Sequence, residues 1–390
     1  MDMLVDELVP MIDRMLPTRP SARYRAVAGY SMGGFGALAM AGKNASVFGT
    51  CISLSPSMNT DAQYRTLGGW DSQWGDIFGG RGTTGDARLT PHYLSLCPLH
   101  FFADNQPSAF ASQKWYVDCG DDEERLYAGS GELHCLLRDK GIDHEFRVRN
   151  GAHTTSYWRE GLREGLAVFK AACDGASYPD ITPVNPAGGA TPEFINVSDA
   201  PCQISLFKGN GLKSNSNTHI VYVEIGEGVP APDAAGVASL LTQSLQVKNA
   251  AVAVVNSADV AAVGADAVFA AVEGTLGVAV ADANRHLMGL GDNLRVVGPL
   301  AVSGRPFAGV YLYDSNLAAG SGATFGAAQY VLDISDMGAN HRAMFNLFCA
   351  LRDAEAKVEY RVRNGVVSSD CTSHGISALG QFIFNTLPIR

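Results

Sequence analysis

The sequence predicts an α/β fold in which helices flank a mostly parallel sheet. Apolar segments of strand length alternate with segments of helical periodicity along the first half of the chain, an order typical of parallel strands joined by crossover helices. Of the 390 residues, 46% are hydrophobic and 17% are charged, which is ample for buried cores. A chain of this length predicts two or three domains.

The elements of the first half follow in order. Apolar side chains recur at helical spacing over residues 2–16, and Pro17 ends this predicted helix. Further strands are expected at 24–28, 48–55, 114–119 and 145–149, and further helices at 34–42, 131–140 and 157–172. Residues 57–112 interrupt this order with glycines, aspartates and aromatic side chains. For them we expect either a cap over a site or a surface excursion with its own small core.

A segment rich in proline and glycine divides the chain. We expect a first domain at 1–172, a linker at 173–194 and a second domain at 195–390. The two domains share an internal repeat, because RDKGIDHEFRVRNG (138–151) and RDAEAKVEYRVRNG (352–365) have eight identities in fourteen positions. At the same offset, WYVDCGDD lies over QYVLDISD.

The repeat predicts two unequal copies. A weaker match sets Ser31 opposite Thr275, and Val367 stands where the first copy has His153. The second copy also has two earlier predicted strands, in HIVYVEIGEG and AAVAVVNSADV, which the first copy lacks. We therefore expect an N-terminally incomplete first copy and a degenerate, non-catalytic second copy. An exposed sheet edge in the first copy makes oligomerisation an option.

Several classes of function are disfavoured by composition. The net charge is −10 and no block of lysine and arginine occurs, so neither a nucleic acid nor a membrane is expected as a partner. No apolar run approaches the roughly 20 residues that span a bilayer. The eight cysteines are scattered without a C-x-x-C pair, so no metal is expected. The first residues lack the pattern of a signal peptide, and the compartment is left open between cytoplasmic and secreted.

The stretch Gly29-Tyr30-Ser31-Met32-Gly33 lies between a predicted strand and a predicted helix. This is the context of a nucleophile elbow, in which a sharp turn lifts the serine oxygen clear of the sheet. The amide of Met32 would then point to the position where an oxyanion forms. Ser31 is the candidate nucleophile, and the alternative is a serine in a glycine-rich turn.

A nucleophilic serine requires a base and an acid. His153 follows the strand predicted to end at Arg149, and it is the candidate base. Several carboxylates in VDCGDDEERLY follow the strand that ends near Cys119. One of them would fix the tautomer of the histidine and stabilise the imidazolium. The order serine, acid, histidine along the chain is the one that α/β-hydrolases use.

The segments AGYSMGGFGAL, DCGDD and EFRVRNGAHTTSYW resemble the esterase D-like group of α/β-hydrolases. This group includes S-formylglutathione hydrolases, feruloyl and acetylxylan esterases and mycolyltransferases. The resemblance covers residues 1–172, with a degenerate echo over 196–390, and implies Ser31 as nucleophile and His153 as base. The family acid usually lies three residues after the glycine of DCG, which gives Glu123. Because this chain has one extra residue in that region, Asp122 is equally tenable. We rank Asp122 slightly ahead, because its counterpart Asp336 is also an aspartate.

The leading prediction is a serine carboxylic-ester hydrolase without a cofactor. The aromatic insertion suggests a flat or sugar-linked ester, with Tyr30, Trp70 and Trp74 as substrate-binding candidates. Family members carry strands and a glycine-containing oxyanion loop ahead of the helix at residue 2, so the source of the second oxyanion donor is open. The alternatives are a non-catalytic binding or scaffold protein, and an acyltransferase that uses an alcohol in place of water.

Overall fold

A computed structural model of the chain describes residues 2–68, 71–123, 125–176, 191–197, 202–209, 211–228, 241, 248–260 and 263–363. The chain divides into two compact units, Met1–Pro179 and Asp180–Arg390. Most of the segment expected as a linker lies outside the described residues, as does Val367. None of the described helices combines the length and the apolar character needed to cross a bilayer.

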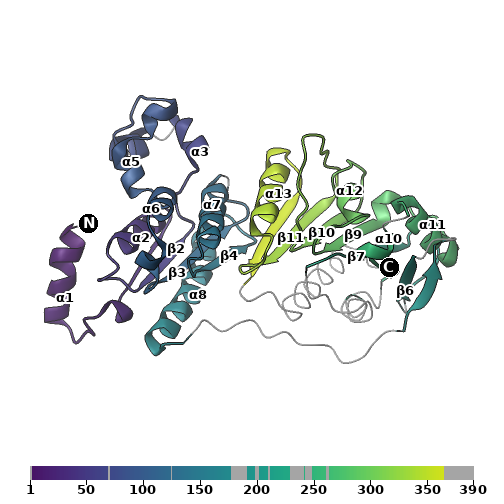
Figure 1. Ribbon diagram of the computed structural model, residues 1–390, viewed down its shortest axis with the longest axis horizontal. Helices are drawn as coiled ribbons and strands as arrows, with labels where there is room; N and C mark the ends of the chain where they lie inside the picture. Colours follow the sequence, from purple (N-terminus) through teal and green to yellow (C-terminus); the bar gives the residue numbers. More distant parts are fainter. Residues whose placement is uncertain are drawn as a thin grey trace. The chain divides into compact units, whose positions relative to one another are not determined.

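The first unit contains a parallel sheet with the strand order β1-β2-β3-β4 (Figure 1). Its strands are β1 (Ala26–Tyr30), β2 (Thr50–Leu54), β3 (Lys114–Gly120) and β4 (Glu145–Arg149). The register sets Tyr30 beside Leu54 and Leu54 beside Asp118, so the strands end at a common edge. Parallel strands with helical crossovers place the following loops together at that edge, and this is where the site lies.

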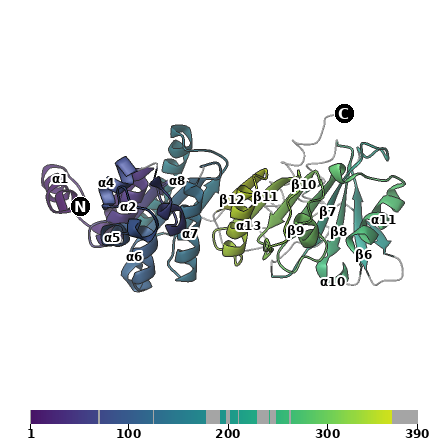
Figure 2. The same cartoon turned by 90° about the horizontal axis from the view of Figure 1, so that it is seen from above.

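Helices cover both faces of this sheet (Figure 2). They are α2 (Met32–Lys43), α6 (Pro98–Asp104), α7 (Leu126–Asp139) and α8 (Thr155–Asp174). Ile52 and Leu54 pack in one cluster with Val168 of α8, whereas Ser53 between them donates a hydrogen bond to the carbonyl of Gly34 in α2. Because side chains alternate along a strand, α8 and α2 lie on opposite faces. The expected fold with a mostly parallel sheet is confirmed.

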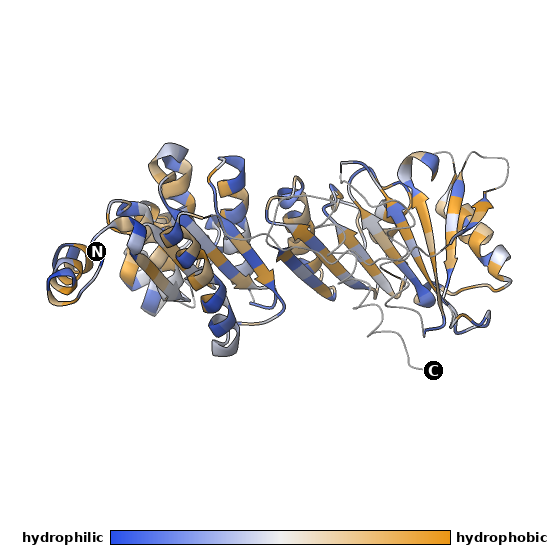
Figure 3. Cartoon of the chain, turned by 90° about the horizontal axis from the view of Figure 1, so that it is seen from below, coloured by the Kyte–Doolittle hydropathy of each residue, from blue (hydrophilic) through white to orange (hydrophobic). Residues whose placement is uncertain are grey.

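The helix expected at residues 2–16 forms as a π-helical segment η1 (Met3–Leu8) that continues into α1 (Val9–Met15). None of its residues is buried, and Met3 and Met15 are 66% and 70% exposed. In Figure 3 the ribbon of this helix, next to the mark for the N-terminus, carries both hydrophobic and hydrophilic residues. On the described part of the chain, β1 pairs on one side only, with β2.

The interruption at residues 57–112 folds as a series of short helices around aromatic side chains. They are α3 (Asp61–Arg65), η4 (Asp71–Gly75), α4 (Asp76–Phe78), η5 (Gly85–Arg88), α5 (Pro91–Leu96), α6 and η6 (Pro107–Phe110). Trp74 stacks on Phe78 and Tyr64 stacks on Tyr93, with ring centroids 5.5 and 4.0 Å apart. This small aromatic core fixes the segment beside the end of the sheet, where it forms one wall of a pocket described below.

The second unit contains a longer sheet with the strand order β12-β11-β10-β9-β7-β8-β6-β5 (Figure 1). Its strands are β5 (Glu193–Asn196), β6 (Gln203–Lys208), β7 (His219–Ile225), β8 (Ala250–Asn256), β9 (Arg285–Leu290), β10 (Gly309–Tyr313), β11 (Gln329–Ser335) and β12 (Val358–Arg363). The six strands β7 to β12 run parallel to one another. β6 pairs antiparallel with β8, and β5 pairs antiparallel with β6. Valines of β7 and β8 fill a core cluster, as expected for strands that are buried on both faces.

Within the described residues, the helices of the second unit are α10 (Ser257–Val260), α11 (Ala265–Leu276), the 3₁₀ turn η7 (Asp282–Asn284), α12 (Val297–Ala301) and α13 (His341–Asp353). The expected match of Ser31 with Thr275 is wrong. Thr275 lies inside α11, before β9 begins, and its hydroxyl donates to the carbonyl of Ala271 at 3.0 Å. The match rested on small apolar residues, which fit a helix as well as a turn.

Candidate active site

The turn that carries Ser31 joins β1 directly to α2. Ser31 has φ 56° and ψ −123°, a strained backbone conformation, and its amide donates to the carbonyl of Leu54 at 2.9 Å. A Cβ on Gly29 would lie 2.1 Å from the carbonyl oxygen of Gly33, so this tight turn requires glycine at position 29. Met32 is the first residue of α2, and amides of a first helical turn have no acceptor within the helix.

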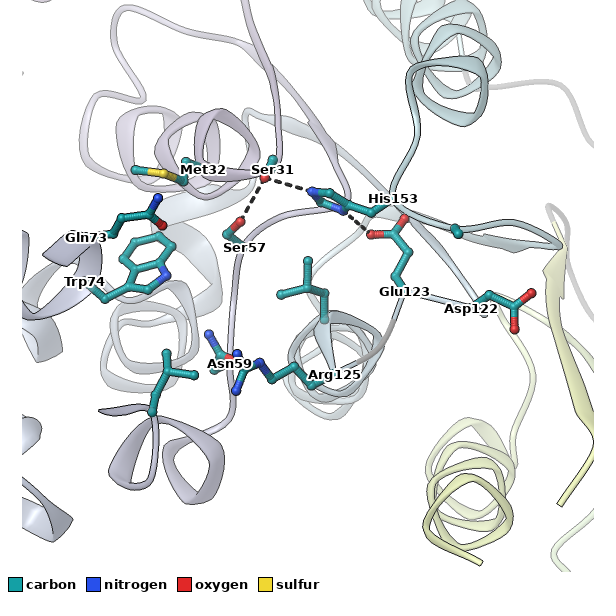
Figure 4. Close-up of a pocket in the computed structure, with 13 residues that line it drawn as sticks. Ser31, Met32, Ser57, Asn59, Gln73, Trp74, Asp122, Glu123, Arg125 and His153 are labelled. Atoms are coloured by element: carbon teal, nitrogen blue, oxygen red, sulfur yellow. Dashed lines mark hydrogen bonds and ion pairs between the residues drawn. The ribbon is translucent and has the colours of Figure 1, made fainter. Parts of the chain in front are cut away.

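His153 links the serine to a carboxylate (Figure 4). Its Nε2 lies 2.9 Å from Ser31 Oγ, and its Nδ1 lies 2.7 Å from Glu123 Oε2. The histidine stands in the loop between β4 and α8, two residues before the helix begins. The side chains of Ser31, His153 and Glu123 thus form one hydrogen-bonded row across the ends of three parallel strands.

The carboxylate of Glu123 is fully buried and held at both oxygens. Oε1 accepts hydrogen bonds from the amide of Gly120, at 2.8 Å, and from the hydroxyl of Ser55. Ser55 in turn accepts from the indole Nε1 of Trp158 at 2.8 Å. The ring of Trp158 also packs edge-on against His153, with centroids 4.8 Å apart. These contacts orient the carboxylate and the imidazole together.

The expected preference for Asp122 over Glu123 is corrected by this geometry. Asp122 is exposed, and its carboxylate points away from His153 in Figure 4. The strand registers explain the error, because Gly120 pairs with Arg149 in the first unit as Ser335 pairs with Arg363 in the second. By this register the counterpart of Asp336 is Asp121, one residue before Asp122.

A second buried carboxylate lies beneath the site. Asp118 Oδ2 is 2.6 Å from Arg149 Nη2, and the carboxylate also accepts hydrogen bonds from the hydroxyls of Tyr157 and Tyr116. Burial raises the pKa of Asp118, and the charge of Arg149 opposes this rise. The network ties the end of β3 to the end of β4 and to the start of α8, the elements that present Glu123 and His153.

The serine and the histidine open into a pocket of about 490 Å³. Its walls comprise Ser31, Met32, Ser57, Asn59, Leu67, Gln73, Trp74, Asp122, Glu123, Arg125, Leu126, Ala152 and His153. Trp74, from the aromatic insertion, forms part of the wall, and its expected contact with a substrate stays a prediction. Tyr30 is not among these residues and stacks on Trp158 instead, with ring centroids 4.4 Å apart. Trp70 lies outside the described residues.

Among the residues that sequence reasoning missed are three whose side chains contact Ser31, Glu123 or His153 directly. Ser55 and Ser57 follow the end of β2, and Trp158 stands in the first turn of α8. The segment SPSMN (55–59), placed directly after a buried strand, was a signal for the two serines. Trp158 closes the segment EFRVRNGAHTTSYW, but nothing in that segment assigned it a role in the site. Within the described part of the chain, His, Cys, Asp and Glu side chains form no cluster of three that could hold a metal ion.

The parallel sheet, the strained turn and the hydrogen-bonded row have the form of an α/β-hydrolase. Comparison with known proteins agrees with this form, since residues 1–169 match the model of a family described as "Putative esterase". The resemblance to esterases that the sequence predicted is thereby confirmed over these residues. Among curated proteins, none matches the chain.

Solved structures that match include a ferulic acid esterase, at 24% identity and a TM-score of 0.35, over 44% of this chain and 60% of that one. A second is S-formylglutathione hydrolase (FrmB) from Staphylococcus aureus, at 15% identity and a TM-score of 0.31, over 43% and 61%. A third is the fluorophosphonate-binding serine hydrolase F of Staphylococcus aureus, at 19% and 0.34, over 44% and 62%. The chain spans about three fifths of the length of these proteins.

Proposed function

We propose that this protein is a serine carboxylic-ester hydrolase that acts through an acyl-enzyme on Ser31. The observation that carries the proposal is the row from Ser31 through His153 to Glu123, with distances of 2.9 and 2.7 Å. Each of these contacts has the length of a working hydrogen bond. Three such side chains at three strand ends, on a turn with the required backbone strain, are far more specific than the serine motif alone.

The chemistry follows from the positions of the protons. The carboxylate of Glu123 accepts a hydrogen bond from Nδ1–H of His153, which keeps the proton on Nδ1, so the Nε2 lone pair faces the hydroxyl of Ser31. When Ser31 Oγ bonds to the ester carbonyl carbon, its proton moves to Nε2 and negative charge collects on the carbonyl oxygen. The imidazolium then protonates the leaving alcohol, which departs and leaves the acyl group on Ser31. A water molecule, deprotonated by His153, releases the acid by the same steps in the same order.

The buried Glu123 carboxylate supports the imidazolium stage. The positive charge that forms on His153 lies 2.7 Å from Glu123 Oε2, while Oε1 is fixed by Gly120 and Ser55. The carboxylate therefore needs no reorganisation when the charge appears, which is the condition for efficient electrostatic catalysis. In this proposal the amide of Met32 is the first hydrogen-bond donor to the oxyanion. Met32 lies at the N-terminal end of α2, where the helix dipole also stabilises negative charge.

The substrate class that the pocket supports is an ester with a group larger than acetyl. A volume of about 490 Å³ with Trp74 in the wall has room for an aromatic acyl group or for one sugar ring. We propose feruloyl-type esters and acylated carbohydrates as the substrates to test, with p-nitrophenyl acetate as the small reference ester.

The test combines turnover with covalent labelling. The folded protein is incubated with p-nitrophenyl acetate and, separately, with a fluorophosphonate probe, and the labelled residue is mapped by peptide mass spectrometry. We expect turnover, and labelling at Ser31 that is lost in Ser31→Ala. A folded protein that neither hydrolyses the ester nor reacts with the probe would support the scaffold alternative. Acyl transfer would appear as a new ester when a sugar alcohol is added to the assay.

A further inference from the structure

A second hydroxyl contacts the candidate nucleophile. Ser57 Oγ lies 3.0 Å from Ser31 Oγ, and the amide of Ser57 donates to the carbonyl of Ser31 at 2.9 Å. Figure 4 shows Ser57 on the pocket side of Ser31, away from His153. The backbone contact holds the segment after β2 against the strained turn, so the two hydroxyls keep a fixed separation.

The direction of the hydrogen bond between the two serines follows from the protons available. His153 donates a hydrogen bond from Nδ1–H to Glu123, so Nε2 carries no proton and must accept, and the single hydroxyl proton of Ser31 is committed to it. The proton between Ser31 and Ser57 therefore comes from Ser57. Its hydroxyl is a donor aimed at the atom that will attack the substrate.

During attack this donor gains a better acceptor. As the bond from Ser31 Oγ to the carbonyl carbon forms, the electron pair of the carbonyl moves to its oxygen, two bonds away from Oγ. A hydroxyl 3.0 Å from Oγ and free to rotate about its own C–O bond can follow the charge to that oxygen. We propose that Ser57 donates a hydrogen bond to the oxyanion and completes the oxyanion hole with the amide of Met32. This inference rests on the proposed ester hydrolysis.

Two observations favour this role for Ser57 over other uses of its hydroxyl. Ser57 cannot serve as the base for Ser31, because a hydroxyl is a far weaker base than the imidazole that already accepts the proton. Nor is its hydroxyl engaged elsewhere, since the described residues offer Ser57 Oγ no hydrogen-bond partner other than Ser31 Oγ. A donor without a competing acceptor needs to break no other bond in order to bind the oxyanion.

The decisive experiment compares Ser57→Ala with the wild type on two quantities. One is kcat/KM for p-nitrophenyl acetate, and the other is the inhibition constant of an aryl trifluoromethyl ketone, which adds to a serine as a stable oxyanion. We expect kcat to fall about 100- to 1000-fold with KM nearly unchanged, the loss typical of one oxyanion donor. The inhibition constant should rise by the same factor as kcat/KM falls, because both report oxyanion binding.

Two controls separate catalysis from structure. Ser57→Thr keeps the hydroxyl and should recover at least a tenth of the wild-type kcat, and the pH profile of Ser57→Ala should keep the wild-type midpoint because His153 is untouched. A Ser57→Ala enzyme within threefold of the wild type, or one whose kcat falls without weaker ketone binding, overturns the inference while the hydrolase proposal stands. A wild-type protein without activity overturns both.

Discussion

The turn after β1 and the turn after β9 share a backbone frame and differ in what they present. The amide of Ser31 donates to the carbonyl of Leu54 at 2.9 Å, and the amide of Gly291 donates to that of Tyr313 at the same distance. Both turn residues have positive φ, 56° and 79°. The two turns therefore share one backbone hydrogen bond and a positive φ, and a serine stands in the first where the second has no side chain.

The helices that follow the two turns differ as well. α2 begins at Met32, directly after the turn, whereas α12 begins at Val297. In the second unit the buried carboxylate of Glu224 accepts from the amides of Arg295, Val296 and Val297, at 2.5, 2.9 and 2.7 Å. An anion of the protein itself thus occupies amides of the kind that would bind an oxyanion. The comparison indicates that the backbone hydrogen bond of the turn does not depend on a serine. The proposed chemistry depends on the hydroxyl of Ser31 and on helix amides that no protein carboxylate occupies.

The largest effect is expected when Ser31 is replaced by glycine, the residue found at the turn after β9. Ser31→Gly should lower kcat/KM for p-nitrophenyl acetate by about 10⁴-fold or more, since the nucleophile is lost. The same change should raise the free energy of unfolding by about 1 kcal/mol, because glycine adopts φ 56° without strain. Ester hydrolysis and urea denaturation measure the two effects. Ser31→Ala is the matched control, which should lose activity without gaining stability, and residual activity above 1% in both variants would remove Ser31 from the mechanism.

The next test uses two neighbouring acids. Glu123→Gln should lower kcat by about 10³- to 10⁴-fold, because a neutral amide cannot balance the imidazolium and permits the wrong tautomer of His153. Asp122→Asn, one residue earlier and exposed, should stay within about twofold of the wild type. Steady-state kinetics on both folded variants decides the matter, and the opposite ranking would contradict the assignment of Glu123.

The contrast between these two acids marks the limit of prediction from the sequence. The strand ends, the turn and the order of Ser31 and His153 were predictable, because each depends on local periodicity and on glycine chemistry. The acid was not, because a shift of one residue between β3 and β11 is invisible in an alignment and reverses which side chain faces inward. The role of Trp158 was unpredictable for a related reason, since its contact with Ser55 joins segments 103 residues apart.

The two glycines of the serine motif should respond differently to the same substitution. A Cβ on Gly29 would meet the carbonyl of Gly33 at 2.1 Å, so Gly29→Ala must displace the turn. We expect a loss of about 1–3 kcal/mol in unfolding free energy, together with reduced activity. Gly33→Ala meets nothing within 4 Å and should retain activity, with a gain of up to about 1 kcal/mol from helix propensity. Thermal unfolding and ester hydrolysis check both, and equal losses would refute the steric account of the motif.

The last prediction concerns acid stability in the second unit. His286 is buried, with Nε2 3.4 Å from Nδ1 of His219 and Nδ1 3.4 Å from the hydroxyl of Tyr311. Burial, with a lesser contribution from His219, lowers the pKa of His286 to about 3. Between pH 6.5 and that value the unfolded chain binds a proton that the folded unit does not, so stability is present above pH 6.5 and is lost as the pH falls. The slope from this one group is at most about 1.4 kcal/mol per pH unit.

A neutral substitute at this position isolates the effect from the other titrating groups. Urea denaturation of the full chain at pH 7, 6, 5 and 4.5 gives the pH slope for the wild type and for His286→Gln. The variant should be less stable at pH 7, because it loses a packed ring, yet its slope below pH 6.5 should be shallower by roughly one proton. A second variant, His286→Phe, restores a ring and should show the same shallower slope with a smaller loss at pH 7. Equal slopes in all three proteins would mean that His286 accepts a proton in the folded state, and that its burial does not set the acid stability of this unit.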